Sequence, residues 1–279
     1  KYVPHGVSER RFFKVDKNDI KFQEFEEKYR LNKYKFKILF LNRNIRRKLP
    51  GDVALAYKHM MDKLTPEQRK ECCLVFHAAP SDENGTDMRA LCKTLLPDYP
   101  VIFTHDYGPP FNDEEMNSNE GFGLGSLEAL TCGTPIVVNV TGGLQDQCGF
   151  MDEAPGGGAF RYLTSEDYIE LKSNHRGTYT NHGKWVKPVF PSNISLQGSP
   201  LTPYIFDDRC RYEDAGEALL EWYNEGPEER ERMGELGRQF VLSDDAMMTG
   251  KHLSENVIDA IDGTFENWKP RERYTMEVI

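Results

Sequence analysis

Residues 120–140 have the sequence EGFGLGSLEALTCGTPIVVNV. Glycine occupies every second position at its start, which indicates a loop. Residues 124–131 favour a helix, and residues 134–140 favour a strand because Ile136, Val137, Val138 and Val140 are β-branched. The stretch therefore predicts a glycine-rich loop that opens a helix and leads into a strand, which is a unit of an α/β fold.

The segments before this stretch continue the alternation. Short apolar runs typical of buried parallel strands occur at residues 35–42, 73–79 and 101–104. Residues 51–64 and 87–96 have helical spacing, and Thr65-Pro-Glu-Gln predicts a capped helix start. The fold class is therefore α/β, with a Rossmann-like parallel sheet and helices on both faces.

The flanking regions differ in character. Residues 1–34 are polar and charged, which predicts a lead-in segment before a single domain at 35–279. Residues 150–205 are rich in Gly, Pro, Ser and Asn, and they predict a long, irregular insertion. Helical patterns then run through residues 215–222, 228–242 and 251–265.

The alternation is interrupted before Glu120. Only about 14 residues separate Thr104 from Glu120, too few for a helix and a strand with their turns. Either the sheet lacks one strand, or residues of a longer protein are absent from this sequence between Asn117 and Ser118. We favour the second interpretation.

Composition limits the class of function. The 279 residues include 35 Lys and Arg and 45 Asp and Glu, which gives a formal charge of -10. This charge argues against duplex nucleic acid as the main partner, because phosphate binding over a long surface requires a basic face. No apolar run is long enough for a membrane span, and the six cysteines have no CxxC spacing. We expect a cytoplasmic protein with free thiols.

The glycine-rich loop has the chemistry of an anion site. Gly121, Gly123 and Gly125 let backbone N–H groups approach a ligand, and the N-terminus of the following helix favours a phosphate. Glu128 is expected in the first helical turn, where a carboxylate can accept hydrogen bonds from ribose hydroxyls. Alternatively, the glycines only form a turn and Glu128 complements the helix dipole.

Two further loops follow predicted strands at their carboxyl ends, where open α/β sheets bind ligands. Arg43 and Lys48 follow the first strand and are suited to clamp a diphosphate. Thr141-Gly-Gly-Leu follows the Val-rich strand. In isolation, each loop is equally well explained as a solvated turn.

Taken together, these motifs resemble the C-terminal, donor-binding half of group 1, family-4-like retaining glycosyltransferases of the GT-B fold. The family has two glutamates separated by seven residues, then Gly-x-Pro, a Val-rich strand and a Gly-Gly turn. Glu120, Glu128, residues 133–135 and residues 141–143 match this pattern. Arg43 and Lys48 match the family's diphosphate-binding pair, residues 4–7 match its lead into this domain, and residues 213–238 match its closing helices.

The resemblance implies a reaction and its residues. A sugar is transferred from a UDP- or GDP-linked donor to an unknown acceptor, with retention of anomeric configuration. Glu120 is the implied catalytic residue, and the implied donor-binding residues are Arg43, Lys48, Gly121, Phe122, Gly123, Leu124 and Glu128. Because the protein supplies the positive charge, no metal or other cofactor is expected.

The chain also departs from the family. The N-terminal half, which carries acceptor contacts, is missing and is expected in a longer protein. His175, Arg176, His182, Trp185 and Trp222 have no assigned counterparts; they could contact an acceptor, although a packing role is favoured for each. Two alternatives stay open, namely a nucleotide-sugar epimerase of the same fold and a non-catalytic nucleotide-sugar-binding domain.

Overall fold

The computed structural model describes residues 3–107, 123–153, 160–162, 181–199 and 202–270. The predicted gap between Asn117 and Ser118 lies outside these residues and stays a prediction.

The first part of the chain forms a three-stranded parallel sheet in the order β1-β2-β3. β1 (Phe36–Leu41) pairs with β2 (Cys72–His77), which pairs with β3 (Val101–Phe103). α2 (Pro50–Lys63) and α3 (Pro66–Arg69) connect β1 to β2, and α4 (Met88–Leu95) connects β2 to β3. These elements confirm the predicted alternation, and Thr65 caps α3 with the expected capping box.

The two faces of this sheet are covered by different segments. Leu74 and Phe76 of β2 pack into a core with α2, α4 and the long helix α8 (Tyr212–Val241). Cys73 and Val75 alternate to the other face, where they pack against Tyr29 and other residues after α1 (Ile20–Lys28). The predicted lead-in segment thus contains a helix, and the residues that follow it cover a face of the sheet.

A second, separate sheet follows α5 (Leu124–Thr131). β4 (Ile136–Asn139) pairs in parallel with β7 (Val186–Val189), and β1 has no pairing with β4 among the described strands. The α/β class with parallel strands and flanking helices is confirmed, whereas the prediction that these strands form one sheet is wrong for the described residues. Apolar composition predicts strands, but strand pairing is decided by contacts between distant segments.

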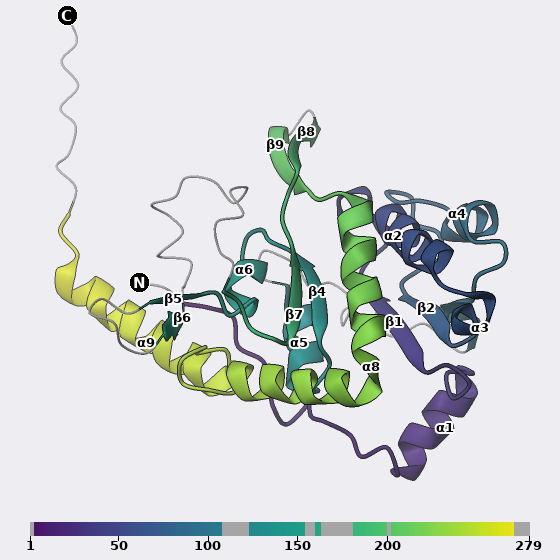
Figure 1. The fold of residues 1–279 in the computed structure, drawn as a ribbon. Coiled ribbons are helices and arrows are strands. Elements are labelled where there is room, and N and C mark those ends of the chain that lie inside the picture. Colours follow the sequence, from purple (N-terminus) through teal and green to yellow (C-terminus); the bar gives the residue numbers. More distant parts are fainter. Residues whose placement is uncertain (1–2, 108–122, 154–159, 163–180, 200–201, 271–279) are drawn as a thin grey trace, which may run out of the picture.

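The prediction of an irregular region over residues 150–205 is also wrong where the structure describes it. The region contains β5 (Met151–Glu153), β6 (Phe160–Tyr162), β7, β8 (Asn193–Ser199) and the start of β9 (Thr202–Arg209). β7 escaped prediction because it is short and contains Pro188, which lacks a ladder donor and is tolerated on an edge strand. β8 and β9 form an antiparallel hairpin that projects from the body of the protein (Figure 1).

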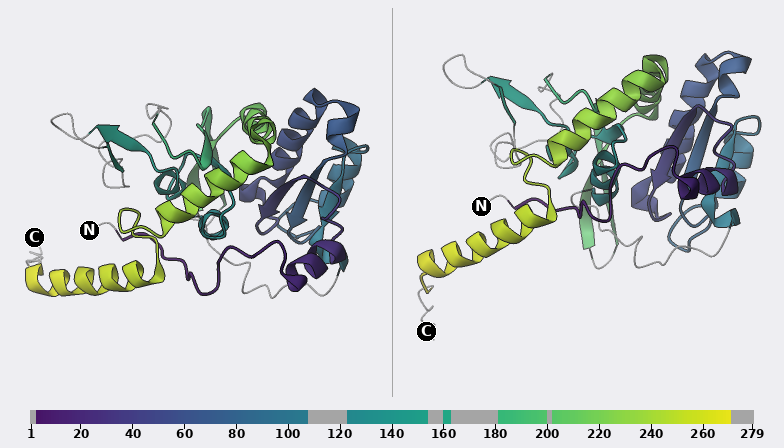
Figure 2. Two further views of the ribbon diagram at one scale, coloured as in Figure 1. Left: turned by 60° about the horizontal axis from the view of Figure 1, so that its bottom comes forward. Right: turned by 90° about the horizontal axis from the view of Figure 1, so that it is seen from below.

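The two sheets are joined by α8 (Tyr212–Val241). Gly226 has φ 80° and ψ 166° immediately before Pro227, so α8 consists of two arms, as the separate patterns 215–222 and 228–242 predict. Trp222 packs in the core of the first sheet, and its Nε1 donates a hydrogen bond to the Ile136 carbonyl oxygen of β4 at 3.2 Å. α9 (Gly250–Asn267) has no buried residue and extends away from both sheets (Figure 2).

Candidate functional site

The start of α5 requires glycine at position 123. Gly123 has φ 82° and precedes the helix as its N-cap. A Cβ atom there would lie 2.3 Å from Leu144 Cδ2, at the start of α6 (Leu144–Gln147). Gln147 Nε2 donates to the Gly123 carbonyl oxygen at 3.0 Å, which ties the loop to α6. The structure thus places Gly123 and Leu124 at a helix N-terminus, whereas Glu120, Gly121 and Phe122 lie outside the described residues.

The first turn of α5 lies against the carboxyl end of β1. A Cβ atom on Gly125 would lie 3.7 Å from the Leu41 carbonyl oxygen and 3.8 Å from its Cδ2. Arg43 follows two residues after Leu41, so the loop that carries the predicted cations begins beside the helix N-terminus. The structure therefore brings two of the sequence-predicted elements to the same edge of the fold.

Both predicted cations lie on the connection from β1 to α2. Arg43 is half-exposed, and its Nε donates to Asp82 Oδ2 at 2.9 Å. Lys48 ends the short 3-10 helix η1 (Arg46–Lys48), just before Leu49 adopts a left-handed conformation with φ 49° at the start of α2.

A residue that the sequence did not single out fixes this connection. Asn44 is fully buried, and its Nδ2 donates to the carbonyl oxygens of Ala79 at 3.1 Å and Thr86 at 2.7 Å. Its Oδ1 accepts the Thr86 N–H at 3.1 Å. Asn44 therefore joins the loop after β1 to the loop after β2. The available signal was the polar turn Ser81-Asp-Glu-Asn-Gly after the second strand, since ligand-site residues gather at carboxyl strand ends.

The third predicted element, the turn after β4, is tied to the base of the β8–β9 hairpin. Thr141 Oγ1 donates to Asp208 Oδ2 at 2.7 Å, and Asn139 Nδ2 donates to the Asp208 carbonyl oxygen at 3.1 Å. Arg209 forms an ion pair of 3.1 Å with Asp52 in the first turn of α2. The end of β9 therefore contacts both the β4 side and the α2 side of this edge.

Comparisons with known proteins identify the fold. No protein-family model and no curated protein matches the chain. Among solved structures, the chain is similar to WaaG, a glycosyltransferase involved in lipopolysaccharide biosynthesis, with a TM-score of 0.52 and 14% identity. The chain has the fold of a glycosyltransferase. The match covers 94% of this chain but 56% of WaaG, so the chain spans little more than half of that protein.

Within this glycosyltransferase fold, Glu128 occupies a different turn from the one predicted. α5 begins at Leu124 and has no acidic residue in its first turn, so Glu128 lies in the second. The prediction was wrong because the left-handed Gly123 sets where the helix begins. The Glu128 carboxyl group is half-buried, and desolvation raises its pKa. Among the described residues, none forms a hydrogen bond or ion pair with this carboxyl group.

The raised pKa of Glu128 leads to a stability prediction. Burial of an acid with a raised pKa costs stability once pH exceeds the ordinary pKa, because the folded state then holds a desolvated charge. We expect Glu128→Gln to raise the melting temperature of the ligand-free protein at pH 7, by about 1–2 °C, and to have less effect at pH 4. Thermal unfolding followed by circular dichroism at both pH values measures this difference. Glu24→Gln, at an exposed position of α1, is the control, and an equal shift at both pH values would contradict the prediction.

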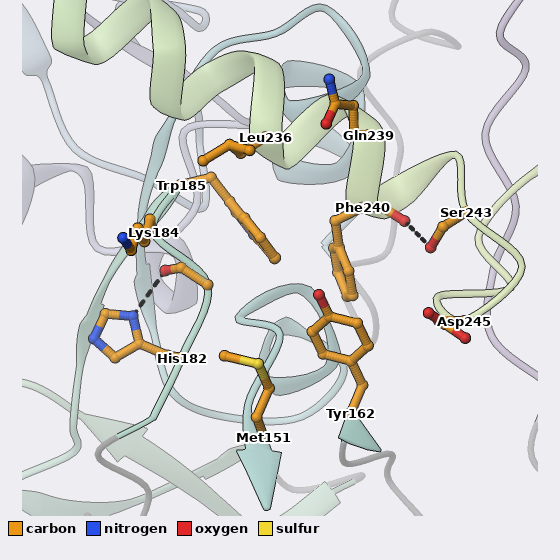
Figure 3. A pocket seen from close by; sticks show the side chains of 11 residues that line it. Met151, Tyr162, His182, Lys184, Trp185, Leu236, Gln239, Phe240, Ser243 and Asp245 are labelled. Carbon is orange, nitrogen blue, oxygen red and sulfur yellow. Dashed lines mark hydrogen bonds between the residues drawn. The ribbon is translucent and has the colours of Figure 1, made fainter. Parts of the chain in front are cut away.

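A separate pocket lies at the amino end of β7, and Arg43 is not among its lining residues (Figure 3). It encloses about 340 Å³. Its walls include Trp185 and Phe240, whose rings stack at 4.6 Å between centroids, and Tyr162, 4.7 Å from Phe240. His182 Nδ1 donates to the Gly183 carbonyl oxygen at 2.8 Å on one side of the pocket.

The tryptophans considered for acceptor contact have packing roles. Trp185 is buried in the core of the second sheet, and its Nε1 donates to the Gln147 carbonyl oxygen at 3.0 Å. Trp222 is buried in the core of the first sheet. Both side chains therefore pack in a core, which agrees with the packing role that the sequence favoured for them. His175 and Arg176 lie outside the described residues.

The described part of the chain lacks the features of a metal cluster and of a membrane-spanning helix. No group of three or more His, Cys, Asp or Glu residues there is arranged to hold a metal ion. Among the same residues, no helix combines the length and apolar character that a membrane crossing requires. The expectation that catalysis needs no metal stays a prediction.

Proposed function

We propose that this chain is the donor-binding half of a retaining glycosyltransferase of the GT-B type. It binds a nucleotide-diphosphate sugar, and the sugar passes to an acceptor of unknown class. One observation supports this more than any other: the first turn of α5 lies beside Leu41, with a Cβ atom on Gly125 falling 3.7 Å from the Leu41 carbonyl oxygen, so a helix N-terminus lies beside the start of the loop that carries Arg43 and Lys48.

The proposed chemistry follows from the charges that develop during transfer. Cleavage of the anomeric C–O bond leaves negative charge on the diphosphate and positive charge on the sugar. Arg43, Lys48 and the backbone N–H groups at the start of α5 stabilise the departing diphosphate, since fixed cations and dipoles lower such a barrier. Glu128 holds the ribose. Glu120 contacts the transferred sugar and is the proposed catalytic residue.

The extent of the WaaG match supports a separation of donor binding and acceptor binding between two halves of a longer protein. The aligned part covers 56% of WaaG, and we infer that acceptor contacts come from a further N-terminal half. The described chain is then sufficient to bind a nucleotide diphosphate, whereas sugar transfer requires both halves.

Binding of nucleotide diphosphates tests the proposal. We expect UDP, GDP or ADP to bind without added metal in isothermal titration calorimetry. Arg43→Ala should weaken that binding at least tenfold, about 1.4 kcal/mol, because the clamp loses its bidentate donor.

Arg46→Ala is the matched control. Arg46 is exposed on the same loop and carries the same charge, but it is not assigned to the clamp. We expect a change of less than about threefold, as for a screened neighbouring charge. If no diphosphate binds, or if Arg43→Ala binds like the wild type, the assigned site is wrong. Equal losses in both variants would indicate general attraction rather than a specific clamp.

A further inference from the structure

We propose that Asp82 is a positioning residue for Arg43, which holds the guanidinium so that its two terminal nitrogens are presented to the diphosphate. The inference rests on the proposed diphosphate site and goes beyond it, because Asp82 lies on the loop after β2 and belongs to none of the motifs that indicated that site.

The geometry of the ion pair carries the argument. Asp82 Oδ2 accepts from the Nε of Arg43 at 2.9 Å. No contact from a residue in the described ranges occupies the Nη1 and Nη2 groups of Arg43, and the side chain is 49% exposed. Because Asp82 occupies only Nε, the end of the guanidinium that carries Nη1 and Nη2 stays open. These two groups can bind two phosphate oxygens in a bidentate contact.

Asp82 is itself held in place. Its Oδ1 accepts the backbone N–H of Asn84 at 2.8 Å, and its side chain is only 13% exposed. The Asn84 carbonyl oxygen accepts the backbone N–H of Arg46 at 3.0 Å. Together with the buried Asn44, these bonds fix the loop after β2 against the loop that carries Arg43.

In the alternative hypothesis, Asp82 competes with phosphate for Arg43, neutralises its charge and weakens phosphate binding. Two observations favour positioning. Asp82 binds the side of the guanidinium and leaves its end to a ligand, and a carboxylate locked by Asn84 does not have to be displaced when an anion binds. Holding a long side chain in place before binding improves affinity by about threefold to tenfold, because less rotamer freedom is lost on binding.

Nucleotide affinity in Asp82 variants tests the inference. We expect Asp82→Ala to weaken binding of the nucleoside diphosphate by about threefold to tenfold, and to leave the affinity for the matching nucleoside, which lacks phosphates, unchanged. Asp82→Asn should lose a similar factor, because Arg43 and Asn84 bond to different oxygens of Asp82 and asparagine replaces one of these oxygens with an NH2 group, which cannot accept. Glu83→Ala, an exposed acid in the same loop, is the matched control and should not weaken binding.

The same titrations separate the possible outcomes. In an Arg43→Ala background, Asp82→Ala should cause no further loss, since its effect passes through Arg43. Unchanged or tighter diphosphate binding in Asp82→Ala would overturn the positioning role, and so would an equal loss for the nucleoside, which would show a merely structural role. If Arg43→Ala binds the diphosphate like the wild type, both the proposed site and this inference are wrong. If Arg43→Ala loses affinity but Asp82→Ala does not, only this inference is wrong.

Discussion

Substitution of Gly234 by alanine is expected to destabilise the protein by about 2–3 kcal/mol. Gly234 is buried in the second arm of α8. A Cβ atom there would lie 1.9 Å from the carbonyl oxygen of Gly133 and 2.7 Å from its carbonyl carbon. Both are backbone atoms of the turn between α5 and β4, so they cannot move aside as a flexible side chain could. The helix would have to separate from this turn, with loss of the packing around it.

The control is a second glycine-to-alanine substitution in a helix, for which we expect the opposite effect on stability. Gly263 lies within α9, and a Cβ atom there would meet nothing within 4 Å. Gly263→Ala should therefore stabilise the protein by about 0.5–1 kcal/mol, because alanine loses less backbone freedom than glycine in a helix. Urea unfolding of both variants measures the two free energies. Destabilisation of less than 1 kcal/mol in Gly234→Ala would mean that the turn and α8 are less closely packed than the structure places them.

The second large effect is expected at the proposed catalytic residue. Glu120→Ala should lower sugar transfer, or hydrolysis of the nucleotide sugar, by at least about a hundredfold in a protein that includes the proposed N-terminal half. The physical reason is the loss of a carboxylate beside the positive charge that develops on the sugar. Diphosphate affinity should change little, because the proposed phosphate contacts come from Arg43, Lys48 and the backbone before α5.

This division between catalysis and binding makes the result specific. Turnover is measured by release of the nucleotide diphosphate, and affinity is measured by calorimetry on the same variant. Glu24→Ala, an exposed carboxylate on α1, should retain both properties. Wild-type turnover in Glu120→Ala would show that Glu120 has another role, and a parallel loss of diphosphate affinity would place it among the binding residues.

Local patterns predicted most of the regular structure correctly. The bounds of β1, β2, β3 and β4 lie within two residues of the predicted runs. The prediction succeeded because short, continuous apolar runs are typical of buried strands. The break in α8 agrees with the two separate helical patterns predicted at 215–222 and 228–242, and the structure places it at Gly226, immediately before Pro227. The region around β7 was mispredicted because its strand depends on a partner, β4, that lies about 50 residues earlier in the chain.

The sequence by itself determined the α/β class, the order of the main helices and strands, and the loops that carry Arg43, Lys48 and Gly123, because apolar periodicity and glycine conformations are local properties. Only the tertiary structure decided that the described parallel strands fall into two sheets, that Glu128 lies half-buried in the second turn of α5, and that Asp82 and Asn44 support the Arg43 loop. These features depend on hydrogen bonds and packing between residues far apart in the chain, and no local pattern encodes which distant partner each group meets.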